Sequence, residues 1–173
     1  MKQFFQGIGF WIFILLTALL LYSGYIVIGS EKLPEKVATQ FNYSGAANGW
    51  MTKSKNMVFF LVIGPAITLI LVGIGSLIQY LPSKYLNAPH ADHWRSAEHY
   101  PSACLFILKM IVILSIALVI FFGVTFHHVV QANQANPPQL NNTNMGISTT
   151  FLLLFVGGWT LTLYYFFLRK PQK

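Results

Sequence analysis

Long uncharged stretches separate the charged residues of this chain. Residues 3–30 and 56–83 form two runs of 28 residues without a formal charge, and residues 110–168 form a third run of 59. A helix needs about 20 apolar residues to cross the hydrocarbon core of a bilayer. The first two runs therefore hold one span each, and the third holds the end of one span and all of another.

The pattern predicts four membrane spans, and a polar stretch at 131–144 separates the last two. The apolar runs are continuous rather than alternating, which favours helices over a β-barrel. We expect an all-α integral membrane protein, a four-transmembrane-helix bundle that forms a single membrane domain over residues 1–173. The spans are expected near 7–29, 57–81, 103–126 and 147–168, with motif-bearing loops at 30–56 and 82–102.

The composition excludes several classes of protein. Apolar residues make up 55% of the chain and charged residues 9%, whereas soluble domains carry about 25% charged residues. A soluble enzyme is therefore excluded. The net charge of +7 does not indicate nucleic-acid binding, because the basic residues stand at the ends of apolar runs and do not gather on one face. A single cysteine, Cys104, excludes an intramolecular disulfide framework.

Lysine and arginine near the span ends predict the orientation of the chain. The two termini and the second loop hold six basic residues, whereas the first loop holds four and the third loop holds none. This difference favours both termini on the cytoplasmic side. The four lysines of the first loop argue against that orientation.

Small residues in two spans predict close packing between helices. The second span carries Gly64, Thr68, Gly73 and Gly75, and the fourth carries Gly157-Gly158. Small side chains let helix backbones approach each other in lipid, where no hydrophobic force drives association. A hinge or a contact in a homo-oligomer is the alternative role for these glycines.

Lys109 is the one formal charge inside a predicted span. It lies seven residues after Ser102, about 10 Å along a helix at 1.5 Å per residue. A charge within a membrane indicates a functional site, and Lys109 is therefore a candidate binding residue. The alternative is that its long side chain reaches the nearer interface. A contact with Glu98 would join the second loop to the third span.

The first loop has the pattern of a folded segment. Gly45 and Asn48-Gly49 are turn signals. Val37, Phe41 and Trp50 are expected to be its apolar anchors. A loose tether would need neither feature, so we expect this loop to fold against the membrane face or against another loop.

Two segments resemble the SdpI-like membrane proteins, a family that includes a domain of unknown function found alone or ahead of an SdpI-type immunity module. The first segment is Leu-Pro-x-x-Val-x-x-x-Phe-Asn-x-x-Gly-x-x-x-Gly-Trp-x-x-Lys at 33–53, and the second runs from Asn87 through Trp94 to Glu98. The chain has Gln40 and Asn48 where the family usually has a histidine and an acid. We therefore expect no proton or metal chemistry in the first loop.

The resemblance implies a non-enzymatic protein of the bacterial cytoplasmic membrane that recognises a membrane-active peptide or relays a signal to a membrane partner. The expected binding residues are Phe41, Asn42, Gly45, Trp50 and Lys53 of the first loop and Asn87, Trp94 and Glu98 of the second. Four complete spans would place these loops on opposite sides of the bilayer. A shared surface therefore requires a re-entrant run, broken at Pro65 or around Gly73.

Two alternatives belong to other functional classes. His90, Asp92, His93 and His99 are residue types that bind zinc, so a metal-dependent membrane hydrolase is one alternative. A wet interfacial loop with polar residues explains the same cluster without a metal, and our leading interpretation includes no cofactor. A structural subunit of a membrane complex is the second alternative. Its small-residue helix faces would then contact a partner or another copy of the chain.

Overall fold

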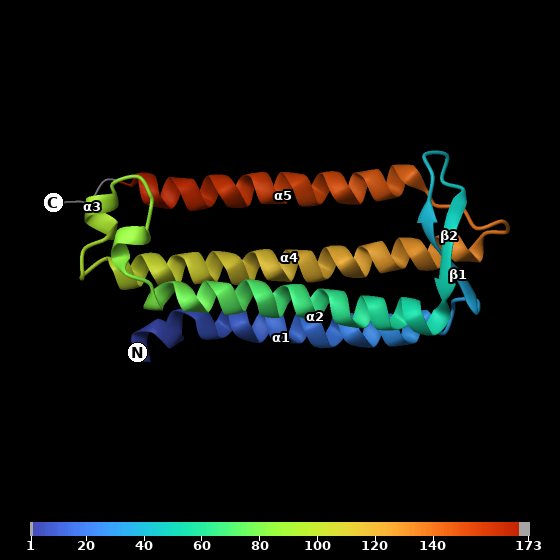
Figure 1. Cartoon of the computed structure of the whole chain (residues 1–173), viewed down its shortest axis with the longest axis horizontal. Helices are drawn as coiled ribbons and strands as arrows, with labels where there is room; N and C mark the ends of the chain where they lie inside the picture. The colour runs from blue at the N-terminus through green and yellow to red at the C-terminus, as the bar shows by residue number, and fades with distance from the viewer. Residues whose placement is uncertain (1, 170–173) are drawn as a thin grey trace.

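Four long helices run side by side through most of the molecule (Figure 1). The computed structural model describes the backbone of residues 2–169 and the side chains of residues 7–169. Within these residues, four helices are long and apolar enough to cross a membrane. The predicted four-helix architecture is therefore confirmed. The helices are α1 (Lys2–Ser30), α2 (Lys53–Leu77), α4 (Tyr100–Gln134) and α5 (Asn142–Leu168).

The shorter elements lie at the two ends of the bundle. Strands β1 (Lys36–Phe41) and β2 (Ala47–Thr52) form an antiparallel hairpin at one end, which we call the hairpin end. Helix α3 (Ala91–Trp94) lies at the opposite end, which we call the α3 end (Figure 1). Two 3-10 helices, η1 (Ile78–Tyr80) and η2 (Ser83–Tyr85), lie between α2 and α3. The expectation of a folded first loop is confirmed by the hairpin.

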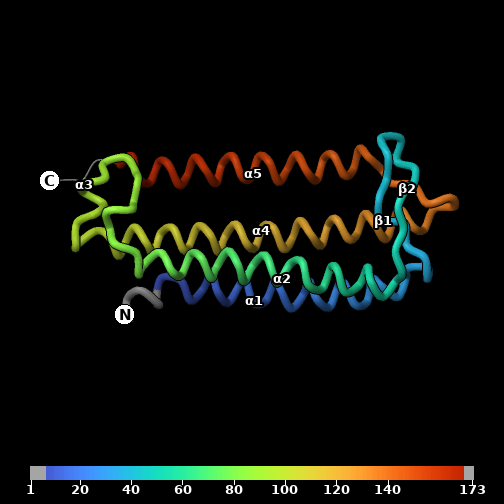
Figure 2. Tube along the Cα trace, in the orientation of Figure 1, coloured from blue at the N-terminus to red at the C-terminus, as the bar shows by residue number. Residues whose placement is uncertain are grey.

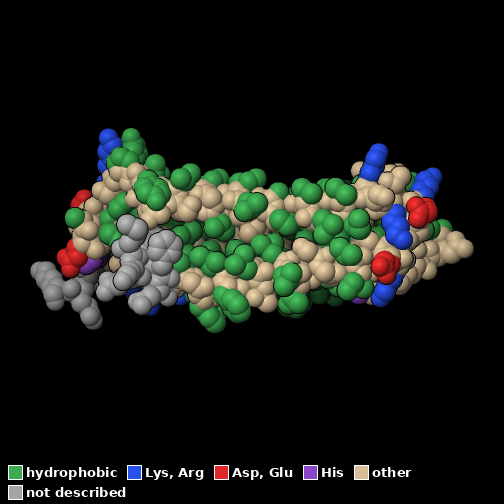
Figure 3. Space-filling model, turned by 90° about the horizontal axis from the view of Figure 1, so that it is seen from below, with side chains coloured by type: hydrophobic (Ala, Val, Ile, Leu, Met, Phe, Trp, Pro, Cys, Tyr) green, Lys and Arg blue, Asp and Glu red, His purple; other side chains and the backbone are tan. Residues whose placement is uncertain are grey.

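Charged side chains gather at the two ends of the molecule, and hydrophobic side chains cover the stretch between them (Figure 3). This distribution suits a bilayer, where charged groups stay in water and apolar groups face lipid. Large apolar side chains such as Leu20, Leu69 and Leu161 are exposed on the long helices. The chain is a multi-pass membrane protein whose helices contact the lipid bilayer.

Glycines allow close contacts between α1, α2 and α4. A Cβ added at Gly64 would lie 2.9 Å from Cε1 of Tyr22, and one at Gly75 would lie 2.8 Å from Cδ1 of Ile111. Packing roles are therefore confirmed for Gly64 and Gly75. A Cβ added at Gly73, Gly157 or Gly158 would meet no atom of another segment within 4 Å, so the prediction of packing within the chain is wrong for these three.

Helix α4 extends further toward the hairpin end than the predicted span at 103–126. It is 35 residues long and ends at Gln134. The extension includes polar residues of the stretch that the sequence predicted to be a loop. One of them, Asn133, forms hydrogen bonds with the backbone of β1. Contacts with the hairpin therefore stabilise helical turns whose polarity alone predicts a loop.

Helix α2 is continuous from Lys53 to Leu77, through both Pro65 and Gly73. The alternative of a re-entrant run broken at one of these residues is therefore wrong. The first loop and the second loop lie at opposite ends of the bundle (Figure 1). The two motif segments consequently do not form one shared binding surface within this chain.

Candidate functional site

The side chain of Asn42 organises the turn between β1 and β2. Its Oδ1 accepts hydrogen bonds from the backbone N–H of Ser44 at 3.0 Å and of Ala46 at 3.0 Å, and from Oγ of Ser44 at 2.7 Å. A short polar side chain that bonds to the backbone two residues ahead is typical of a tight turn. Asn42 therefore shapes the tip of the hairpin, and its acceptor oxygen is already occupied.

Gly45 joins the hairpin to the third loop. Its φ of +82° lies in the left-handed region that favours glycine. Its carbonyl accepts a hydrogen bond of 2.9 Å from the backbone N–H of Leu140, and a Cβ at this position would overlap the carbonyl oxygen of Leu140. Both the backbone conformation and the close approach therefore require glycine here.

The third loop and the hairpin form one folded unit, which we call the hairpin cap (residues 36–52 and 135–142). Figure 2 shows the hairpin beside the connection between α4 and α5, and a single antiparallel bridge pairs Ala46 with Gln139. Nδ2 of Asn142, the first residue of α5, donates to the carbonyl of Tyr43 at 2.7 Å. The cap is thus connected directly to the start of α5.

Aromatic side chains are exposed on the hairpin cap. Tyr43 is fully exposed, and Trp50 is 43% exposed. Nζ of Lys36 lies 5.3 Å from the ring centroid of Trp50, a cation–π distance. Trp50 is therefore not the buried anchor that the sequence predicted, whereas Val37 is fully buried. An open depression beside Tyr43 is lined by Phe41, Asn42, Tyr43, Asn48, Asn142 and Met145.

Lys53, another expected binding residue, also has a structural contact. Its Nζ donates to the carbonyl of Glu31 at 3.3 Å, and its backbone N–H donates to the carbonyl of Glu35 at 3.0 Å. Glu31 follows the end of α1 directly. Lys53 therefore holds the start of α2 beside the end of α1 and fixes the base of the hairpin.

The second loop contains a buried tryptophan between exposed polar residues. Trp94 is buried, and its Nε1 donates to the carbonyl of Phe167 at 3.2 Å. Its ring lies 4.8 Å from the ring of Phe166. Asn87 and Glu98 are exposed. Trp94 therefore attaches the last turns of α5 to the second loop, whereas Asn87 and Glu98 lie at the surface of that loop.

Two of the four candidate zinc ligands lie side by side. The ring centroids of His93 and His99 are 3.9 Å apart. Burial lowers the pKa of His93, the nearby His99 and His90 lower it further, and Glu98 opposes them. A structural zinc site usually has four protein ligands and a catalytic site three. Among the described residues, no group of three or more His, Cys, Asp or Glu side chains is placed to hold a metal ion.

Lys109 faces α1. Its Nζ lies 5.3 Å from the ring centroid of Trp11. The contact of Lys109 thus joins α4 to α1, whereas the contact with Glu98 considered from the sequence would have joined α4 to the second loop. The four acidic residues of the chain are Glu31, Glu35, Asp92 and Glu98. All four lie outside the four long helices, so no carboxylate of a span partners Lys109.

Helix α5 is held by a few polar contacts along its length. At the hairpin end, Nε2 of His128 and Oγ of Ser148 are 3.0 Å apart. Further along, Nε1 of Trp159 donates to the carbonyl of Met110 at 2.7 Å. Within the described part of α5, Phe167 is the one buried residue. Helix α5 is therefore connected to the cap, to α4 and to the second loop, but its surface is mostly open.

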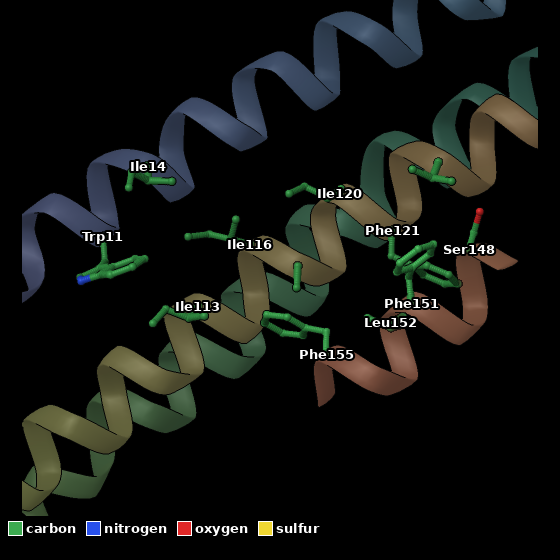
Figure 4. A pocket seen from close by; sticks show the side chains of 12 residues that line it. Trp11, Ile14, Ile113, Ile116, Ile120, Phe121, Ser148, Phe151, Leu152 and Phe155 are labelled. Carbon is green, nitrogen blue, oxygen red and sulfur yellow. The ribbon is translucent and has the colours of Figure 1, made fainter. Parts of the chain in front are cut away.

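An apolar groove lies between α1, α4 and α5 (Figure 4). Its volume is about 450 Å³. It extends along α4 from Ile113 to Val124, and Ser148 is the one lining residue with a side-chain hydroxyl. The sequence pattern does not reveal this groove, because its three walls come from segments that are distant in the sequence. Other lining residues include Trp11, Ile116, Ala117, Phe121, Leu152 and Phe155.

The sequence pattern did not reveal Tyr43 and Asn142 of the hairpin cap, or Asn133 of α4, which bonds to the cap. Tyr43 occupies a variable position of the first-loop motif, and the two asparagines lie in a polar stretch without a distinctive pattern. The one available signal was the density of asparagine around 133–144, since asparagine side chains often bond to backbone groups.

Comparison with known proteins gives a match for part of the chain. No curated protein and no solved structure gives a significant match. One family model matches residues 10–64. This segment covers most of α1, the whole first loop with both strands, and α2 as far as Gly64. It therefore includes Tyr22 and Gly64, which pack together, as well as the hairpin. Residues 10–64 match the model of a family described as Domain of unknown function (DUF1648).

Proposed function

We propose that this chain is a non-enzymatic membrane protein that recognises a membrane-active peptide at the hairpin cap and relays its presence through α5. The SdpI-like immunity and sensing proteins, which its two motif segments resemble, are the model for this role. The observation that carries the proposal is the hydrogen bond from Asn142 to Tyr43. It connects an exposed aromatic surface directly to the start of a loosely packed helix.

The surface of the cap suits an amphipathic peptide. Tyr43 and Trp50 offer exposed aromatic rings, the side chains that most often dominate binding at protein interfaces. Residues 31–55 contain four lysines and two glutamates, so this region carries a net positive charge. A peptide with apolar side chains and an excess of acidic groups therefore fits this surface best.

The contacts of α5 supply a route for a signal. A peptide that displaces Tyr43 acts on Asn142, and the opposite end of α5 contacts Trp94 through Phe167. Few buried contacts restrain the helix between these points, so a small shift costs little packing energy. Asn87 and Glu98, exposed on the same loop as Trp94, would present the change to a membrane partner.

The proposed role places the hairpin cap outside a bacterial cytoplasmic membrane and both termini in the cytoplasm. The third loop, 135–141, carries no charge and lies in the cap together with the first loop. Counted together, the first and third loops carry four basic residues, whereas the second loop and the two termini carry six, and the more basic side of such a protein is the cytoplasmic one. The α3 end, with Lys84 and Arg95 in its loop, then faces the cytoplasm.

Binding of two synthetic peptides to the full chain in phosphatidylcholine vesicles tests the proposal. The peptides share one apolar helical face and differ in net charge, one anionic and one cationic. We expect the anionic peptide to bind more tightly, and Tyr43→Ala and Trp50→Ala each to weaken its binding about tenfold, as loss of an aromatic interface residue does. Tyr85→Ala is the matched control, because Tyr85 is an exposed tyrosine in the second loop.

Two results would contradict the proposal. One is equal binding of the anionic peptide by the wild-type chain and by both cap variants. The other is a loss of peptide binding in Tyr85→Ala as large as that in the cap variants. It would show that binding depends on exposed aromatic residues at either end of the bundle. Absence of binding by both peptides would also reject recognition of amphipathic peptides at the cap.

A further inference from the structure

We propose that the groove between α1, α4 and α5 holds one acyl chain of an anionic phospholipid, whose headgroup is bound by Lys109. The groove is almost entirely apolar, and its single lining hydroxyl is that of Ser148. That hydroxyl is within hydrogen-bond distance of Nε2 of His128. The lining therefore offers an acyl chain dispersion contacts, and its one hydroxyl already has a hydrogen-bond partner.

The length of the groove fits one leaflet of a bilayer. From Ile113 to Val124 there are 11 helical steps along α4, which correspond to about 17 Å at 1.5 Å per residue. Half of the hydrocarbon thickness is about 15 Å. The groove is therefore long enough to take most of one acyl chain.

The charge of Lys109 determines which lipid fits. Lys109 lies one helical turn before Ile113, between the groove and the α3 end. Its ammonium is placed over the ring of Trp11, which also lines the groove. The four long helices contain no carboxylate to neutralise this charge. An anionic headgroup supplies the missing counter-charge, which a zwitterionic lipid supplies less well.

The packing of α5 fits the same occupant. A hydrogen bond between Trp159 and Met110 joins α5 to α4 beside the groove. Helices α1 and α5 line the groove from opposite sides (Figure 4). Aromatic side chains such as Phe121 and Phe155 line the opening and do not close it. In a bilayer, an apolar groove of this size does not stay empty. The acyl chains of the surrounding lipids are the molecules available to fill it.

Native mass spectrometry of the detergent-purified full chain tests this proposal. The probes are phosphatidylglycerol and phosphatidylcholine with identical acyl chains. We expect one phosphatidylglycerol to be retained in preference to phosphatidylcholine. Lys109→Met should weaken retention of phosphatidylglycerol about fivefold, the effect of one basic residue near a membrane surface, and should leave phosphatidylcholine unchanged. Lys109→Arg should keep the preference.

A second variant tests the groove itself. Ala117→Phe places a larger side chain in the lining and should remove the retained lipid of either class. Leu69→Phe is the matched control, since Leu69 is exposed on α2 away from the groove. Equal retention of phosphatidylglycerol by Lys109→Met and wild type would overturn the headgroup assignment. Equal lipid retention by Ala117→Phe and Leu69→Phe would overturn the groove as the site.

These outcomes are independent of the proposed recognition of peptides. The two groove variants change residues of α4 and leave the hairpin cap intact. If the lipid is lost while peptide binding at the cap persists, the groove is a lipid site of its own. If the cap variants lose peptide binding but still retain the lipid, the result supports the cap proposal and leaves the groove proposal unchanged.

Discussion

The side-chain amide of Asn133 forms hydrogen bonds with both backbone groups of Ala38. Oδ1 accepts from the backbone N–H at 2.7 Å, and Nδ2 donates to the carbonyl at 2.9 Å. Ala38 is fully buried, so its backbone groups cannot turn to water. One asparagine near the end of α4 thus satisfies both backbone hydrogen-bonding groups of a β1 residue and attaches the hairpin to the helix bundle.

Asn133→Ala should destabilise the hairpin cap. The substitution leaves a buried N–H and a buried carbonyl without their partners, at a cost of about 1–3 kcal/mol. We expect faster hydrogen exchange at the amides of β1, measured by mass spectrometry on the chain in detergent. Gln131→Ala, at an exposed position of the same helix, is the control. Equal exchange in the two variants would show that Asn133 does not hold the strand.

Gly45→Ala should separate the hairpin from the third loop. An L-residue at a φ of +82° costs about 1–2 kcal/mol, and the added Cβ would overlap the carbonyl oxygen of Leu140. We expect faster cleavage by protease within residues 43–46 and 139–142. Gly146→Ala has nothing within 4 Å of its Cβ and lies in a helix. It should therefore resist protease as well as the wild type, and a similar increase there would contradict this explanation.

The architecture could be predicted from the sequence because the bilayer imposes a length on each span. Runs such as 3–30 and 56–83 exceed that length. A helix is the simplest structure that gives every backbone N–H and carbonyl of such a run a hydrogen-bond partner in lipid. The packing of Gly64 and Gly75 could be predicted because small side chains let helix backbones approach each other in lipid. Gly157 and Gly158 look identical in sequence, but only the position of α5, set by distant contacts, leaves them open.

The site could be predicted only in part. A turn needs Asn42 and Gly45 locally, so their importance was visible in the motif. The burial of Trp94 depends on Phe167, which is 73 residues away, and the sequence therefore assigned Trp94 and the exposed Trp50 the same role. The groove could not be predicted for a related reason. It is lined by α1, α4 and α5 together, and none of these segments has a distinctive pattern by itself.

Lower pH should loosen the second loop through His93. Burial and the neighbouring His99 and His90 lower its pKa below the usual 6.5, while Glu98 opposes the shift. A histidine with a lowered pKa binds fewer protons in the folded state than in the unfolded state. The stability of this loop is therefore fully present above pH 6.5 and declines as the pH falls from there toward the lowered pKa.

NMR titration of the histidine ring protons measures this effect. We expect the His93 midpoint below 6.5, and a smaller acid-induced change in the fluorescence of Trp94 in the His93→Gln variant. His127→Gln is the control, because His127 is an exposed histidine at the hairpin end of α4. A His93 midpoint at or above 6.5 would show that burial does not control its protonation.

Trp94→Phe should release the end of α5 while leaving the hairpin cap unchanged. The substitution keeps an aromatic ring against Phe166 but removes the donor to the carbonyl of Phe167. Loss of one hydrogen bond of this kind costs about 0.5–1.5 kcal/mol, and we expect a corresponding increase in hydrogen exchange over the last turn of α5. Trp50→Phe, at an exposed position, should leave that exchange unchanged. If instead Trp50→Phe alters exchange at the end of α5 and Trp94→Phe does not, the second loop does not anchor this helix, and the relay through α5 fails at its final contact.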